Sequence, residues 1–297
     1  MAGDDGTASI LALADRAEAL GLDSVWIGDS LLAKPRHEPL AMLAAIAGRT
    51  RRVKLGTAVL LPVLRNPVLL AHQVATIDQI SQGRLILGVG IARDLPAIRA
   101  EFAAAGVPFE KRIGRMLEGL QLCRALWSGK PVDWEGRWTV RNGQLAPMPF
   151  TGGGPPIWGG GDSPGALKRA GEHFEGWFPS GAQSPAVWRE HWAQVTAFAR
   201  DAGREPTAIT GAVYLTLSVD DNASRANAEL DRYLAQYYQR PAAEIRTQQY
   251  CFAGSRVAAA EWLRAFVAAG VTHIVVRFTG DHERHMAMLS DMRTDIF

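Results

Sequence analysis

The sequence has few cysteines, no long hydrophobic run and almost no excess of charge of either sign. Its 2 cysteines, Cys123 and Cys251, lie far apart and follow no CxxC or Cys/His spacing. This argues against a disulfide framework or a zinc site and favours a reducing, cytoplasmic location. The longest apolar runs, such as Leu85–Ala92, are too short to cross a bilayer. Residues 1–9 contain no basic segment, so we expect no secretory signal.

Charge and motif content disfavour further classes of function. The chain of 297 residues carries 32 basic and 30 acidic side chains, a formal net charge of +2, without a lysine- or arginine-rich stripe. We therefore expect neither a nucleic-acid nor a membrane partner. The absence of HExxH and GxxxxGK(S/T), and of GxGxxG after a first strand, disfavours a metalloprotease, a P-loop hydrolase and a Rossmann domain. We expect no metal site, because His282 and His285 lack a suitably spaced third ligand and are typical of a solvated helix start.

Short buried runs alternate with helical patterns along most of the chain. The expected strands are residues 24–29, 53–61, 85–91, 156–160, 176–179, 210–218 and 272–278. The expected helices are residues 8–20, 39–49, a segment opened by Asn66 and Pro67, 110–127, 164–171, 186–202, 222–238 and 256–269. The first strands recur about every 30 residues with helices between them, which is typical of right-handed βαβ units.

This alternation predicts an α/β fold, a TIM (β/α)8-type barrel in a single domain spanning residues 1–297. The pattern supplies seven strands rather than eight, because Met1–Thr7 is polar and unlike a buried strand. The first strand is therefore expected to be missing or truncated. Residues 128–155 are rich in glycine, proline and tryptophan, and we interpret them as an insertion with a small hairpin or lid.

Barrel enzymes carry their chemistry at the carboxyl ends of the strands. Three glycines, Gly159, Gly160 and Gly161, follow one expected strand, and Ser163 and Pro164 then open a helix. Free backbone N–H groups and the positive end of the helix dipole would suit a phosphate there. The alternative is a tight strand-to-helix turn without a ligand.

Asp29 and Arg277 are the charged candidates for catalysis at strand ends. Asp29 would contact the cofactor or act in proton transfer; alternatively, it caps the segment that follows. Strand alternation puts Arg277 on the face opposite Ile274, Val276 and Phe278, pointing into the barrel mouth. Arg277 could there bind a phosphate or an acidic substrate, or instead pair with a structural carboxylate.

Four stretches carry spaced motifs in the order found in a known enzyme family. Leu55–Ala92 contains R-x-P, A-x-x-x-A-T-x-D and S-x-G-R-L-x-L-G-x-G patterns. Phe109–Gly136 is similar to an E-R…E…LW-x-G segment, and Pro155–Pro179 to a P-x-x-x-G-G…A…GW-x-P segment. With Gly21–Leu31, these motifs span most of residues 8–180. The sequence thereby resembles the luciferase-like superfamily of FMN- and coenzyme F420-dependent oxidoreductases.

The resemblance implies a cofactor ring lying over the strand ends. The expected cofactor contacts are Thr57, Ala58, Val59, Gly88 and Gly90 near the ring, and Gly159, Gly160, Gly161, Ser163 and Ser180 at the later strand ends, with the phosphate at the helix start. Many F420-type relatives have Asp-His where this chain has Asp29 and Ser30, so a histidine acid/base at that position is absent.

The activity implied by the resemblance is hydride transfer with coenzyme F420, which we favour, or monooxygenation with reduced FMN. The substrate would be a small organic molecule. A flavin reductase would be a partner if FMN is used, and a homodimer is expected. Two alternatives stay open, namely a non-catalytic luciferase-related ligand-binding protein and a non-flavin phosphate-binding barrel lyase or isomerase. The latter would need a lysine or paired carboxylates at strand ends, and no lysine ends a strand.

Overall fold

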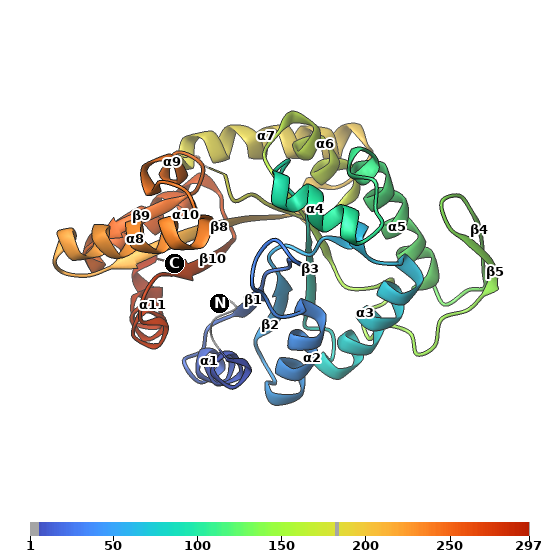
Figure 1. Cartoon of the computed structure of the whole chain (residues 1–297), viewed down its shortest axis with the longest axis horizontal. Coiled ribbons are helices and arrows are strands. Elements are labelled where there is room, and N and C mark those ends of the chain that lie inside the picture. The colour runs from blue at the N-terminus through green and yellow to red at the C-terminus, as the bar shows by residue number, and fades with distance from the viewer. Residues whose placement is uncertain (1–5, 182–183, 297) are drawn as a thin grey trace. The chain divides into compact units, whose positions relative to one another are not determined.

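The computed structural model describes residues 6–181 and 184–296. Its contacts divide the chain into two compact units, one formed by Met1–Glu18 and Asp23–Ile157 and the other by Ala19–Leu22 and Trp158–Phe297. Each unit has its own parallel strands and its own covering helices (Figure 1). The single-domain organisation of residues 1–297 stays a prediction.

The N-terminal unit is built on three parallel strands, β1 (Ser24–Ile27), β2 (Lys54–Thr57) and β3 (Leu85–Val89). β1 pairs with β2, and β2 pairs with β3. Its helical elements are α1 (Thr7–Ala19), α2 (Pro39–Arg49), η1 (Pro62–Leu64), α3 (Pro67–Ser81), α4 (Pro96–Ala104), η2 (Phe109–Lys111) and α5 (Arg112–Leu126). Among residues 6–181 and 184–296, no strand precedes α1.

Helix α3 begins where the sequence predicts it. The side chain of Asn66 accepts a hydrogen bond from the backbone N–H of Val68 at 2.9 Å, and Pro67 occupies the first turn. The helix then packs on α5, where Trp127 Nε1 donates to the carbonyl of Ala71 at 3.0 Å. This packing fixes the helix that connects β2 to β3.

The second strand is shorter than the expected run of residues 53–61. β2 ends at Thr57, and the Ala58–Val59 peptide bond is cis. The chain then regains only an isolated parallel bridge between Leu60 and Val89. The carboxyl end of β2 is therefore an irregular loop rather than a continuing strand.

The segment 128–155 contains the predicted hairpin, formed by β4 (Val132–Glu135) and β5 (Thr139–Gly143). The backbone N–H of Arg137 donates to Glu118 Oε1 of α5 at 2.6 Å, and the two side chains form an ion pair. These contacts hold the hairpin against α5. A lid function for this segment stays a prediction.

The C-terminal unit contains a parallel sheet in the order β6 (Ile157–Gly160), β7 (Gly176–Phe178), β8 (Thr210–Val219) and β10 (His273–Phe278). A further strand, β9 (Cys251–Gly254), pairs with the distal part of β8. The helical elements are α6 (Pro164–His173), α7 (Pro185–Asp201), η3 (Pro206–Ala208), α8 (Ala223–Tyr238), α9 (Ala242–Arg246), α10 (Arg256–Ala269) and α11 (His282–Ile296). Strand β9 and helices α4 and α9 were not predicted from the sequence.

The two faces of this sheet carry different aromatic side chains. On one face, Trp177 packs on Trp188 of α7, with ring centroids 5.5 Å apart, and Phe278 stacks on His285 of α11 at 5.4 Å. Arg277 follows the predicted alternation and lies on the other face, beside its register partner Thr216 of β8.

Candidate functional site

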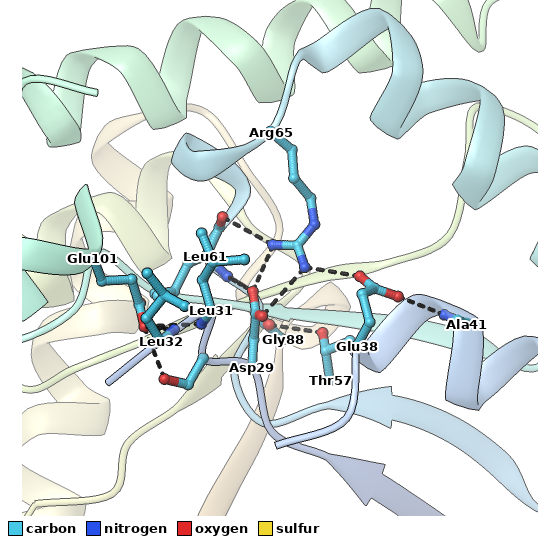
Figure 2. A network of polar contacts seen from close by, with 11 residues as sticks. Asp29, Leu31, Leu32, Glu38, Ala41, Thr57, Leu61, Arg65, Gly88 and Glu101 are labelled. Atoms are coloured by element: carbon cyan, nitrogen blue, oxygen red, sulfur yellow. Dashed lines mark hydrogen bonds and ion pairs between the residues drawn. The ribbon is translucent and has the colours of Figure 1, made fainter. Parts of the chain in front are cut away.

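Asp29 follows β1, and its carboxylate is tied into the loop after β2 (Figure 2). Oδ2 accepts hydrogen bonds from the backbone N–H of Leu61 at 2.9 Å and from Arg65 Nη1 at 2.6 Å, and Oδ1 accepts from Arg65 Nη2 at 3.2 Å. The Asp29 side chain is only 4% exposed. Burial lowers the pKa of Arg65, but its bonds to Asp29 and Glu38 outweigh this effect and raise the pKa overall. Asp29 thus links two strand ends, and its role in proton transfer stays a prediction.

Glu101 of α4 is a buried carboxylate that holds the loop following Asp29 (Figure 2). Its Oε2 accepts hydrogen bonds from Ser30 Oγ at 2.9 Å and from the backbone N–H groups of Leu31, Leu32 and Ala33 at 2.8, 2.7 and 2.7 Å. Its Oε1 is buried without a hydrogen-bond partner among the described residues. The sequence gives no sign of this role for Glu101, because a glutamate is usually solvent-exposed.

The ends of β2 and β3 bring together the residues predicted to lie near the cofactor ring. Thr57 is fully buried, and its hydroxyl donates to the carbonyl of Gly88 at 2.8 Å. Ala58 and Val59 are half-buried. A Cβ atom at Gly90 would lie 2.7 Å from Val59 Cγ2, so the absence of a side chain permits this close approach. In this structure Thr57 therefore stabilises the strand ends, while Ala58, Val59 and Gly90 retain accessible surface.

The glycine run after β6 combines a packing role with an open turn. A Cβ atom at Gly159 would lie 2.4 Å from the Phe174 ring, which assigns this glycine a packing role. Gly160 is half-buried, whereas Gly161 is exposed and has a φ of +96°. The carbonyl of Gly161 accepts a hydrogen bond from Trp177 Nε1 at 2.8 Å. Trp177 therefore holds the turn at Gly161 in place, while Gly161 itself stays exposed to solvent.

Arg169 is a cation at the start of α6 that was not predicted from the sequence. A Cβ atom at Gly165 would lie 3.2 Å from Nη1 of Arg169, so the guanidinium lies over the first turn of the helix. Arg169 is half-buried and forms no ion pair or hydrogen bond with another described residue. Burial lowers the pKa of its guanidinium. The signal that could have identified Arg169 in the sequence is a basic residue within two turns of a helix start that contains proline and glycine.

Two serines were predicted at these strand ends. Ser163 is the exposed N-cap of α6, and its hydroxyl makes no capping hydrogen bond. Gly161–Gly165 also matches the G-x-S-x-G pattern of hydrolases, but Ser163 has an ordinary φ of −66° rather than a strained elbow conformation. Ser180 follows β7 and is half-buried.

Arg277 is enclosed by tyrosines rather than paired with an acid. Its Nη2 donates to Thr216 Oγ1 at 2.7 Å and to the Tyr238 hydroxyl at 3.1 Å. The distances from its Cζ to the ring centroids are 5.3 Å for Tyr214, 5.3 Å for Tyr233, 5.2 Å for Tyr237 and 5.7 Å for Tyr238. Burial alone would lower the pKa of Arg277, but the surrounding tyrosines raise it overall. The alternative of a structural carboxylate partner finds no support among the described residues.

The histidines expected at a solvated helix start are placed differently. α11 does begin at His282, but His285 is buried and its Nδ1 lies 2.6 Å from the carbonyl of Asp281. Its ring packs on Phe278, so the expectation of a solvated position is wrong for His285. Within residues 6–181 and 184–296, no group of three or more potential ligands is arranged to hold a metal ion. In the same part of the chain, no helix combines the length and apolarity needed to span a membrane.

The chain is similar in sequence to a named reductase and a named dehydrogenase. Over 75% of its length, the chain is 32% identical to a 5,10-methylenetetrahydromethanopterin reductase of Methanolobus tindarius, and the match spans 65% of that protein. Over 94% of its length, it is 28% identical to an F420-dependent glucose-6-phosphate dehydrogenase of Nocardia farcinica, of which 90% is covered. These relatives confirm the predicted oxidoreductase class.

Two solved structures share the fold at low sequence identity. The coenzyme F420-dependent tetrahydromethanopterin reductase of Methanopyrus kandleri gives a TM-score of 0.80 at 21% identity, covering 98% of this chain and 96% of that protein. The oxygenating constituent of 3,6-diketocamphane monooxygenase from Pseudomonas putida, in complex with FMN, gives 0.76 at 20% identity, with coverages of 98% and 93%. The predicted TIM-type α/β fold class is thereby confirmed. The model of the luciferase-like monooxygenase family matches residues 2–295, and the chain therefore belongs to this family.

Proposed function

We propose that this chain is an F420-dependent oxidoreductase that transfers a hydride to or from a small organic substrate. The observation that carries the proposal is the loop between β6 and α6. An exposed glycine turn at Gly161 is followed by a helix N-terminus, over which Arg169 holds a guanidinium that has no anionic partner among the described residues. Backbone amides, a helix dipole and an arginine together fit a phosphate group of a cofactor.

The remaining predicted residues have separate roles in this proposal. In the N-terminal unit, Ala58, Val59 and Gly90 offer accessible surface at the ends of β2 and β3, and their contact with a cofactor ring stays a prediction. Asp29 and Arg65 would keep these loops in place through their buried ion pair. F420 supplies hydride transfer when bound, and the protein supplies orientation and exclusion of water.

Reduced FMN is the alternative cofactor, since it also carries a phosphate. A flavin reductase would then be needed as a partner to provide the reduced form. Ser30 stands where many F420-type relatives have histidine, and its hydroxyl is engaged with Glu101 at 2.9 Å. A proton donor for the substrate would therefore have to come from elsewhere than this position. A homodimer stays a prediction.

The test is a fluorescence titration of F420 and of FMN into the wild-type protein and two variants. We expect F420 to bind more tightly than FMN. Arg169→Gln should weaken binding about tenfold, because it removes a charge-assisted contact of about 1.5 kcal/mol. Lys168→Gln makes the same charge change at the neighbouring exposed residue and should leave the affinity within twofold.

Each outcome of the titration supports the proposed cofactor or contradicts it. Tighter binding of FMN would replace F420 by FMN in the proposal. Failure of the wild-type protein to bind either cofactor would overturn it and favour a non-catalytic ligand-binding protein. Equal losses in Arg169→Gln and Lys168→Gln would mean that general charge, rather than the loop, attracts the cofactor.

A further inference from the structure

Arg277 has hydrogen-bond donors that residues 6–181 and 184–296 leave unused. Arg84 provides the comparison, because its Nε, Nη1 and Nη2 make five hydrogen bonds to oxygens of the protein, at 2.7 to 3.0 Å. Arg277 makes two, both from Nη2. Its Nε is buried without a partner, and no bond from Nη1 to a described residue is formed. A guanidinium has five N–H donors, so this side chain retains capacity for an external acceptor.

The charge of Arg277 also lacks a counter-ion among the described residues. Burying an unpaired charge is costly unless an opposite charge or a set of dipoles replaces its hydration. Four tyrosine rings lie 5.2 to 5.7 Å from its Cζ, and each contributes only a partial offset through its electron-rich face. An anion beside Nε and Nη1 would complete the neutralisation.

The tyrosines leave this position close to solvent. Arg277 is 9% exposed, while Tyr214, Tyr233, Tyr237 and Tyr238 are each half-buried. Arg277 is the fifth residue of β10 and lies near its carboxyl end. The loop between β6 and α6 begins at the carboxyl end of a parallel strand in the same sheet, and barrel enzymes bind their substrates at such ends.

We infer that Arg277 and its four tyrosines bind the acidic group of the substrate, so that the chain acts on organic carboxylates or phosphates. This inference rests on the proposed function and adds the chemical class of the substrate. The anion accepts hydrogen bonds from Nε and Nη1 of Arg277, and the tyrosine rings contact the organic part next to it.

The first experiment locates the anion directly. Crystals of the wild-type protein with bound cofactor are soaked in sodium bromide, and anomalous scattering identifies the bromide positions. We expect a bromide ion within hydrogen-bonding distance of Arg277 Nε or Nη1. Absence of bromide there, with bromide bound elsewhere in the same crystal, would contradict the inference.

The second experiment measures affinity for benzoate by calorimetry at constant ionic strength, with cofactor saturating. We expect Arg277→Gln to weaken benzoate binding at least tenfold. Arg264→Gln, which removes an exposed charge from α10, should leave the binding unchanged. An equal effect of both variants, or none of either, would overturn the inference. If Arg277→Gln does not fold, Arg277→Lys replaces it, because lysine keeps the charge but lacks the Nε and Nη1 donors. Benzoate binding should then weaken about threefold, and the bromide result decides.

The outcome is separable from that of the proposed function. Cofactor affinity is measured independently and is expected to be unchanged in Arg277→Gln. Wild-type protein that binds F420 but shows no anion at Arg277 would overturn only the assignment of an acidic substrate. A loss of cofactor affinity in Arg277→Gln would instead assign this arginine to the cofactor.

Discussion

Replacement of Glu101 tests whether one buried carboxylate determines the conformation of the loop after β1. Oε2 of Glu101 receives one hydroxyl and three successive backbone N–H groups, all at 2.7 to 2.9 Å. Glu101→Ala removes all four acceptor contacts at once. The donors of the loop then either form hydrogen bonds with water or stay unpaired. We expect the loop to lose its fixed conformation.

The magnitude follows from the number of bonds and from the exposure of the loop. A hydrogen bond to a charged group contributes about 1.5–3 kcal/mol. Water can replace part of the lost bonding, because Leu31 and Leu32 are 55% and 69% exposed. We therefore expect Glu101→Ala to lower the free energy of unfolding by about 3–5 kcal/mol. Glu101→Gln keeps one acceptor oxygen, but its NH2 group takes the place of Oε1, which is buried without a hydrogen-bond partner among the described residues. We expect this variant to lower the free energy of unfolding by about 1–2 kcal/mol.

Two measurements check this expectation. Urea denaturation gives the loss of stability, and hydrogen–deuterium exchange gives the protection of the amides of residues 31–33. The control is Glu110→Gln, which removes an exposed carboxylate that pairs with Arg99 and should leave both readouts unchanged. Wild-type exchange at residues 31–33 in Glu101→Ala would refute the reasoning, since the amides would then be protected by something other than this carboxylate.

Three further predictions concern other parts of the two units. Arg65→Met leaves the buried Asp29 without its cation and should lower the melting temperature by several degrees, corresponding to about 2–4 kcal/mol; Asp29→Asn combined with Arg65→Met should recover part of this loss, and no recovery would argue against the pairing. Gly161→Ala forces a side chain into φ +96° and within 3.2 Å of Ala166 Cβ, so it should destabilise the protein by about 1–2 kcal/mol and weaken cofactor binding in the same fluorescence titration. Burial lowers the pKa of His285, so the unfolded chain takes up a proton that the folded chain does not; stability at this site should be present above pH of about 6.5 and decrease as the pH falls below it. His285→Gln should flatten that part of the pH–stability profile, and an unchanged profile would contradict the assignment.

The sequence determined the local elements where capping, glycine and apolar spacing agree. Asn66 and Pro67 open α3 as expected, and the seven expected strands all occur, because their apolar residues can be buried only in a sheet covered by helices. The glycine-rich turn before α6 was also evident, since only glycine readily adopts the φ observed at Gly161. The spaced motifs also predicted the family, and the family model that matches residues 2–295 confirms it.

Only the tertiary structure decided how the charged residues are used. Glu101 and Arg169 carry no local mark of their roles, because one depends on a loop 68 to 71 residues away and the other on the direction of a flexible side chain. Strand alternation correctly predicted the face of Arg277, but its four tyrosines come from β8 and α8, and pairing between distant segments is not encoded in local spacing. Sequence periodicity fixes which way a side chain points, whereas its partner depends on which other segment packs against that face.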